Sequence, residues 1–174
     1  MFQVFFVVVC PFHKGIRSVV QVAFPEEYLL YEKAFQAGVW EPAHPGPWLG
    51  RAVVWKLQVG PHRDGLDAGP ACIFNCGHYT GGEAILIDLE AKLRYAKPGD
   101  VIIFFAGAVY HAVAPWLPAP VLDLRLQKAH ITAGRVSHVL FSPHATVQRL
   151  HDKPYLWWKL TCDGKYPYIP PKQT

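Results

Sequence analysis

The chain has 174 residues, of which 51% are apolar or aromatic and only 17% are charged. This length favours one domain over two, and the low charge with so many apolar residues excludes a disordered chain. The net charge of +4 permits contact with nucleic acid or an acidic surface but does not demand it, since ordinary solubility charge explains it as well.

The chain begins with ten mostly apolar residues, MFQVFFVVVC, which are followed by Pro11. This run is too short to span a bilayer, and no basic segment or obvious cleavage site marks it as a signal peptide. We therefore predict a buried strand here. The four cysteines are predicted to be reduced, partly buried thiols of an intracellular protein, and Cys72 and Cys76 do not have the spacing of a common zinc knuckle.

The one clear helix of the first half is predicted over Pro25–Ala37. Pro25 suits the first helical turn, and Glu26 and Glu27 suit the positive end of the helix dipole. Gly38 can end the helix.

Short β-type runs separated by turn residues follow a loop rich in Pro and Gly at 40–48. The predicted strands are Ala52–Val59, Ala71–Cys76, Ala84–Leu89, Leu93–Tyr95, Val101–Phe105, Val109–Pro115, Val121–Leu126 and Arg135–Ser142. This pattern predicts a mainly β protein, namely a double-stranded β-helix (a jelly roll or cupin-like barrel) with one or two flanking helices. The expected single domain covers 1–174 with its core at about 50–143. Residues 1–49 form an N-terminal flank, and 144–174 form a C-terminal helix and tail.

Several smaller features complete this prediction. Gly81–Gly82 is interpreted as a hairpin turn and Gly99–Asp100 as an ordinary turn. A short helix is expected at His144–Leu150, followed by an aromatic tail that packs across the barrel. Trp157 and Trp158 are interpreted as packing residues of that tail rather than as a platform for bases.

A candidate metal site comes from His62 and Asp64, which are one residue apart at the end of a predicted strand. In an extended chain, residues i and i+2 point to the same side, so both side chains can reach one ion. His111, in the apolar run VYHAV, points where core residues point and can supply a third ligand. Two imidazoles and one carboxylate form the facial triad of non-haem Fe(II) oxygenases. The alternatives are a turn capped by Asp64 and a core histidine at His111.

A cosubstrate with a distal carboxylate needs a cation at fixed geometry, and arginine offers bidentate pairing. Arg135 begins a late predicted strand, and Ser137 projects to the same face and can donate a second hydrogen bond. Arg125 is the competing candidate.

The ordered set of His-x-Asp, Gly-Gly-Glu, Gly-Asp, a distal His and Arg-x-Ser resembles the 2-oxoglutarate/Fe(II) dioxygenase superfamily. The finer pattern HRD…CIFNCGHYTGGEAILIDL…LRYAKPGDVIIFFAGAVYHAV…GRVSHVLFSP resembles a group of fungal dioxygenase-like proteins related to the TET/JBP enzymes. The resemblance covers about residues 50–143. It implies a double-stranded β-helix that uses Fe(II), 2-oxoglutarate and O₂.

By this resemblance, the metal ligands correspond to His62, Asp64 and His111, and the cosubstrate is anchored by Arg135 with help from Ser137. The insert between His111 and Arg135 is longer than is usual in the superfamily, which leaves Arg125 as an alternative.

The resemblance also implies a methylated base in DNA or RNA as the substrate, which would place the protein in the nucleus. A base in a duplex must be flipped out to reach the iron, and nearby residues suited to a basic or aromatic rim are Arg51, Lys56, Arg63 and Tyr79. The alternative is a protein or small-molecule hydroxylase, for which a cytoplasmic location is expected. No membrane association is predicted. Asn75, His78 and Tyr79 are further candidates for the pocket lining.

Two rival functions fit part of the pattern. They are a cupin-like barrel that binds a metal without catalysis and a zinc hydrolase, which also uses two histidines and a carboxylate. Both leave Arg135 and Ser137 without a role.

Overall fold

The computed structural model describes residues 5–8, 12–38, 46–94, 100–120, 122, 124–125 and 133–171. Its helices are α1 (Phe12–Ala23), α2 (Pro25–Gly38), the 3₁₀ helix η1 (Ile87–Leu89), α4 (His144–Leu150) and α5 (Trp157–Thr161). Its strands are β1 (Phe5–Val8), β2 (Gly50–Trp55), β3 (Ala71–Cys76), β4 (Tyr79–Gly81), β5 (Ala84–Leu86), β6 (Ala91–Leu93), β7 (Asp100–Phe104), β8 (His111–Val113), β9 (Trp116–Pro118) and β10 (Val136–Phe141).

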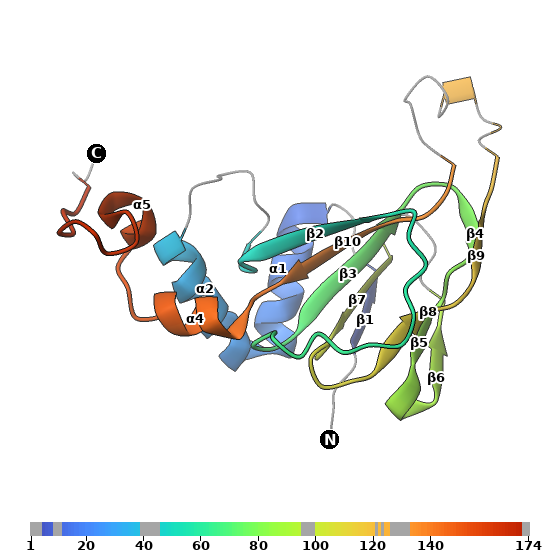
Figure 1. Cartoon of the computed structure of the whole chain (residues 1–174), viewed down its shortest axis with the longest axis horizontal. Helices are drawn as coiled ribbons and strands as arrows, with labels where there is room; N and C mark the ends of the chain where they lie inside the picture. Colours follow the sequence, from blue (N-terminus) through green and yellow to red (C-terminus); the bar gives the residue numbers. More distant parts are fainter. Residues whose placement is uncertain are drawn as a thin grey trace.

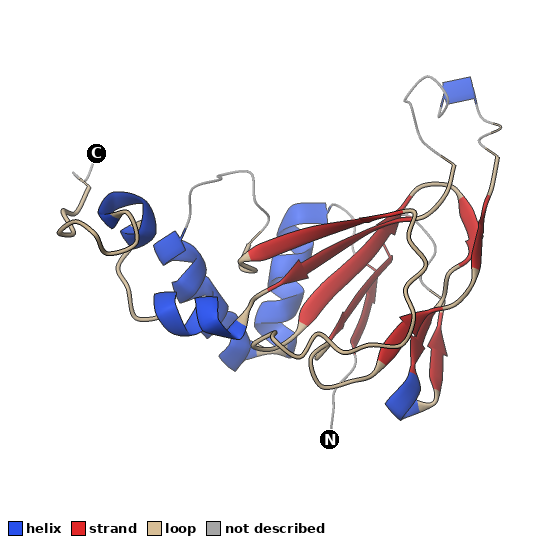
Figure 2. Ribbon diagram, in the orientation of Figure 1, coloured by secondary structure: helices blue, strands red, loops and turns tan. Residues whose placement is uncertain are grey.

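The strands form a large antiparallel sheet with the order β1-β7-β3-β10-β2 and two small sheets, β6-β5-β8 and β4-β9. Figure 1 shows the small sheets at one end of the molecule and helices α2, α4 and α5 at the other end. Figure 2 shows the same division between strands and helices. The fold is thus mainly β and of the jelly-roll or cupin-like type, as predicted.

The two small sheets are one bent ladder. Gly81 pairs with Trp116 in β4-β9, and Ala84 pairs with Val113 in β5-β8, so one antiparallel register runs through both. Gly81 and Gly82 have φ values of +76° and +74°, which L side chains rarely adopt. The prediction of a hairpin turn at these glycines was therefore wrong, because they bend a continuous strand instead of reversing it.

Helices α1 and α2 cover one face of the large sheet. Their apolar residues pack with alternate residues of β3, β7 and β10 in a buried cluster made of Ile16, Val20, Phe24, Tyr28, Tyr31, Trp48, Cys72, Phe74, Val101, Ile103, Leu140 and Val147. Helix α2 confirms the predicted helix, whereas α1 was not predicted from the sequence. Ile16, Val20 and Phe24 recur at four-residue spacing, but the β-branched valines of this stretch and Gly15 weaken its helix propensity.

The predicted strands Val101–Phe105, Val109–Pro115 and Arg135–Ser142 were confirmed in position but not in length. The predicted strand Leu93–Tyr95 overlaps β6 only at Leu93, and Tyr95 lies outside the described residues. The strand near the N-terminus is confirmed at Phe5–Val8, and β3 has the predicted bounds. The run predicted from Ala84 to Leu89 is a short strand followed by the 3₁₀ helix η1, and β2 ends at Trp55 instead of Val59.

The predicted strand Val121–Leu126 lies mostly outside the described residues. Within it, Leu124 and Arg125 are helical, so the strand prediction was wrong at those two positions. Of the predicted turn Gly99–Asp100, Gly99 lies outside the described residues, and Asp100 is already part of β7.

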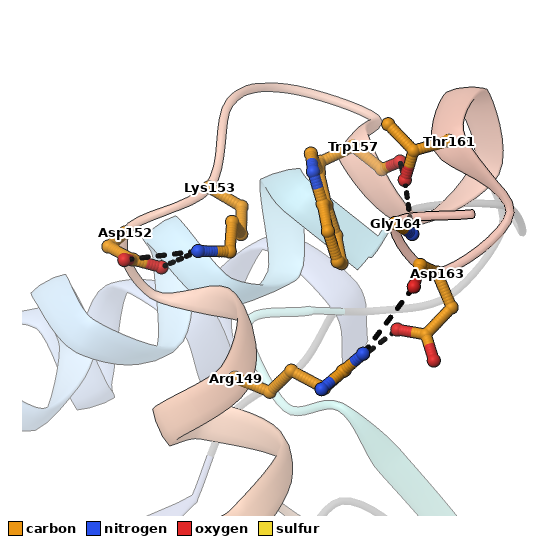
Figure 3. A network of polar contacts seen from close by, with 7 residues as sticks. All are labelled: Arg149, Asp152, Lys153, Trp157, Thr161, Asp163 and Gly164. Atoms are coloured by element: carbon orange, nitrogen blue, oxygen red, sulfur yellow. Dashed lines mark hydrogen bonds and ion pairs between the residues drawn. The ribbon is translucent and has the colours of Figure 1, made fainter. Parts of the chain in front are cut away.

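The C-terminal tail packs against α2 and α4. Trp157 and Trp158 lie against a buried cluster of Ala34, Ala37 and Leu150, which confirms their packing role. Figure 3 shows Arg149 of α4 bound to Asp163, with 2.7 Å from Nε to Oδ1. The prediction that the tail packs across the barrel was wrong, because α5 lies at the helical end of the molecule (Figure 1).

The described cysteines carry free thiols, with Cys72 buried and Cys76 and Cys162 exposed. Cys10 lies outside the described residues. Among the helices that the structure describes, none combines the length and the apolar character needed to cross a bilayer.

Candidate metal centre

His62 reaches the site through a segment that leaves the large sheet. After β2, Lys56 takes a positive φ of 53°, and its N–H donates to the carbonyl of Arg135 at 3.0 Å. The chain then crosses to the small sheet, where His62 pairs with His111 as an isolated antiparallel bridge. The prediction placed His62 and Asp64 at the end of a strand. They lie instead in a separate extended segment beside β8.

The bridge brings the two imidazoles together. His62 and His111 exchange both backbone hydrogen bonds at 2.9 Å, so they lie directly opposite each other with their side chains on one side of the ladder. Their ring centroids are 4.2 Å apart. The contact between His62 and His111 could not be predicted from local sequence periodicity, because the two residues are far apart in the chain.

Asp64 completes the group. Its N–H donates to the carbonyl of Ala106 at 3.0 Å, and Gly107 leaves room for the backbone, since a Cβ there would lie 2.9 Å from the Asp64 carbonyl oxygen. One carboxylate oxygen lies 3.7 Å from Nε2 of His62, and the other lies 3.8 Å from Nε2 of His111. The three ligand atoms all lie within 4.8 Å of one another, which suits coordination of a single ion.

The hydrogen bonds of the two imidazoles determine which ring nitrogen of each can bind a metal. Nδ1 of His62 lies 2.9 Å from the carbonyl oxygen of Gly60, and Nδ1 of His111 lies 3.0 Å from that of Val109. A carbonyl only accepts, so each Nδ1 carries the hydrogen, and each Nε2 turns a lone pair toward Asp64. Burial lowers the pKa of His111, which favours the neutral form that a metal needs.

The residues present thus fit a divalent metal. Two nitrogens and one carboxylate on one face of a metal ion leave coordination positions open on its opposite face. The His111 side chain is 9% exposed, whereas those of His62 and Asp64 are 38% and 34% exposed, so the site opens toward solvent on the side of His62 and Asp64.

The group opens onto a cavity of about 490 Å³ between the two sheets. The lining residues come from the inner faces of β2, β3, β5, β7, β8 and β10 and from the segment that carries His62. They are Ala52, Val54, Val59, His62, Arg63, Asp64, Gly65, Leu66, Asp67, Ile73, Ala84, Leu86, Ile102, Phe104, His111, Ala112, Val113, Arg135, Ser137, Val139 and Phe141. A cavity of this size accepts a small ligand.

Arg135 and Ser137 both line this cavity and are almost fully buried, at 2% and 3% exposure. Gly82 makes room for the arginine, because a Cβ there would lie 3.0 Å from Arg135 Cδ. Arg125 is exposed and is not among the described residues that line the cavity. Of the two candidate arginines, the structure thus brings only Arg135 to the metal centre's cavity.

The hydroxyl of Ser137 donates to Oδ1 of Asn75 at 2.6 Å. Asn75 is buried, but neither it nor His78 nor Tyr79 belongs to the described lining of the cavity. Asn75 instead orients Ser137, and Tyr79 packs beside Gly82.

Sequence reasoning missed Asp67, which lies on the cavity wall. Its Oδ2 atom is buried without a hydrogen-bond partner in the described residues. Burial, with a smaller contribution from the charge of Asp64, raises the pKa of Asp67 to about 6. The sequence signal was a second aspartate three residues after Asp64, in the run HRDGLD.

Comparisons with known proteins agree with this arrangement at the level of fold. No family model matches the chain, and no curated protein matches it in sequence. Among solved structures, it is similar to NgTET1 in complex with 5mC DNA, with a TM-score of 0.55 and 20% identity. The match covers 82% of this chain and 50% of that chain, so the present chain spans about half the length of the similar protein. The resemblance to TET/JBP-like dioxygenases inferred from the sequence is thereby confirmed for the fold.

Proposed function

We propose that this protein is an Fe(II)- and 2-oxoglutarate-dependent oxygenase that hydroxylates a C–H bond. The observation that carries the proposal is the convergence of His62, Asp64 and His111 at the edge of a cavity that also holds the buried Arg135. We infer that residues 1–174 act as one oxygenase domain with its core at about 50–143.

In this proposal, His62, Asp64 and His111 hold the metal. Bound Fe(II) supplies the chemistry by which O₂ and 2-oxoglutarate are converted to succinate and CO₂ while one oxygen atom enters the substrate. Arg135 binds the distal carboxylate of 2-oxoglutarate, and its burial strengthens that charge pair because little water competes for it. Ser137 supports the same end of the cosubstrate and is held in place by Asn75.

The substrate that we propose is the methyl group of a methylated pyrimidine in DNA or RNA. The similar protein NgTET1 was solved in complex with 5mC DNA, which supports this choice. This substrate implies a nuclear location.

The alternative within the same chemistry is hydroxylation of a protein or small molecule, with a cytoplasmic location. A non-catalytic metal-binding barrel or a zinc hydrolase would use the same three ligands but would give the buried Arg135 no ligand to bind.

The proposal is tested by loading the purified protein with Fe(II) and measuring conversion of 2-oxoglutarate to succinate. The wild type should bind about one iron per chain and turn over 2-oxoglutarate. His62→Ala removes one ligand and should lower the affinity for iron by about 100-fold or more. His144→Ala is the matched control, because His144 is exposed at the start of α4. Folded wild-type protein that takes up only zinc and ignores 2-oxoglutarate would refute the proposal.

The substrate is tested separately with methylated and unmethylated oligonucleotides. Nucleic-acid recognition predicts oxidation of the methyl group and binding that weakens steeply with salt, because bound phosphates release counterions. Succinate formation without any effect of the oligonucleotides would instead favour a protein or small-molecule substrate.

A further inference from the structure

An exposed leucine lies at the rim of the cavity, two residues after Asp64. Leu66 is 83% exposed, although it also lines the cavity beside the metal ligands. Single exposed apolar residues are common on protein surfaces and need no explanation by themselves. Leu66 differs because of where its backbone holds it.

The backbone of Leu66 is fixed on both sides. The N–H of Asp67 donates to the carbonyl of Asp64 at 2.9 Å, which closes a tight turn around Gly65 and Leu66. The carbonyl of Leu66 accepts from the N–H of His144, at the start of α4, at 2.8 Å. The apolar side chain is therefore presented to solvent from a rigid position at the mouth of the cavity.

An exposed cationic residue lies between the metal ligands His62 and Asp64 in the chain. Arg63 contributes to the cavity lining, and its guanidinium carbon is 4.4 Å from the centroid of the Tyr110 ring, which is not part of the described lining. The backbone of Tyr110 is held in turn, because its N–H donates to Asp88 at 2.7 Å and its carbonyl accepts from Ile87. Among the described residues, no carboxylate forms an ion pair with Arg63, so its charge is available to a phosphate.

This pair of groups matches what a flipped base requires. Removing a base from a duplex leaves a gap in the stack, and proteins that deform DNA frequently insert Leu, Ile, Met or Phe between bases. The phosphates beside the gap attract a guanidinium.

We propose that Leu66 is a wedge that enters the duplex where the target base has been flipped out, while Arg63 contacts the adjacent phosphate. This inference rests on the proposed function, because it requires a nucleic-acid substrate. Leu66 is thus a positioning residue: it acts on the duplex and not on the reacting methyl group.

The test measures binding by iron-free protein, so it does not depend on turnover. The probes are a short duplex with one 5-methylcytosine and a 2-aminopurine beside it, and the same methylated strand alone. We expect Leu66→Ala to weaken duplex binding by about tenfold and to remove the rise in 2-aminopurine fluorescence that reports unstacking. Binding of the single strand, which has no stack to open, should change less than twofold.

Two further variants make the test specific. Leu117→Ala is the matched control, because Leu117 is 70% exposed on β9 and is not among the described lining residues; it should behave as the wild type. Leu66→Met should restore most of the duplex binding, since methionine also fills a gap in the stack.

The outcomes separate this inference from the proposed function. Wild-type protein that binds neither probe would overturn both the nucleic-acid substrate and the wedge. Wild-type protein that binds both probes, with Leu66→Ala indistinguishable from it on the duplex, would overturn the wedge alone.

Discussion

The two faces of the large sheet are built from the same strands but differ in packing. One face is filled by helices, and the other borders a cavity. On one face, Cys72 and Phe74 of β3 pack against α1 and α2 in a continuous buried cluster. On the other face, Ile73 of β3 and Ser137 of β10 border the cavity of the metal centre. Alternation along a strand therefore reveals two covered faces but does not reveal which face is packed solid and which is left open for a ligand.

The largest expected effect comes from truncating the packed face. Ile103 on β7 is 1% exposed within the cluster under the helices, and Ile103→Ala should lower the free energy of unfolding by about 2–5 kcal/mol. Ile73→Ala removes the same atoms from the cavity face, where space already exists, and should cost less than half as much. Urea denaturation of both variants measures the difference.

Equal losses for these two isoleucine variants would contradict the comparison. They would mean that the cavity face supports stability as strongly as the packed face, and the cavity would then be filled by side chains in solution.

A smaller effect is expected from the charge on the cavity face. Arg135→Lys keeps the charge but loses bidentate pairing, so the affinity for 2-oxoglutarate should fall by about 10- to 100-fold in calorimetric titration of iron-loaded, oxygen-free protein. Arg125→Lys is the control and should stay within about twofold of the wild type, because Arg125 is exposed outside the described cavity lining. A larger loss of 2-oxoglutarate affinity in Arg125→Lys than in Arg135→Lys would mean that Arg125 binds the cosubstrate.

The smallest effect concerns Asp67, whose pKa is raised to about 6 by burial and then by the charge of Asp64. The folded protein holds this proton more tightly than the unfolded chain, so the stability of the metal-free protein falls as the pH rises from about 4 to 6. Asparagine cannot ionise, and Asp67→Asn should therefore raise the free energy of unfolding by about 1 kcal/mol at pH 7.5 and by little at pH 4.

Denaturation of Asp67→Asn at the two pH values checks this expectation. Glu90→Gln serves as the control, since it removes one carboxylate from an exposed position. If Asp67→Asn raises the free energy of unfolding as much at pH 4 as at pH 7.5, the aspartate is destabilising for a reason other than its charge.

Local chemistry explains which parts of the site were predictable. His62 and Asp64 share a side because an extended chain alternates, and that rule holds whether the segment is a strand or, as observed, a single bridge beside β8. The helix at Pro25 and the strand at Ala71 were predictable for the same reason, since their end signals and side-chain period are local. Helix α1 was missed because its valines and Gly15 oppose the helical pattern, and packing against the sheet outweighs that weak propensity.

The sequence by itself determined the β-rich fold class, the candidate ligands and the arginine–serine pair, because each depends on residue chemistry and short-range periodicity. Only the tertiary structure decided that His111 lies opposite His62, that Arg135 and not Arg125 lines the described cavity, and that Gly81–Gly82 bends one ladder. The physical reason is that register between distant strands, and the space left between two sheets, arise from the packing of the whole chain and are encoded at no single position.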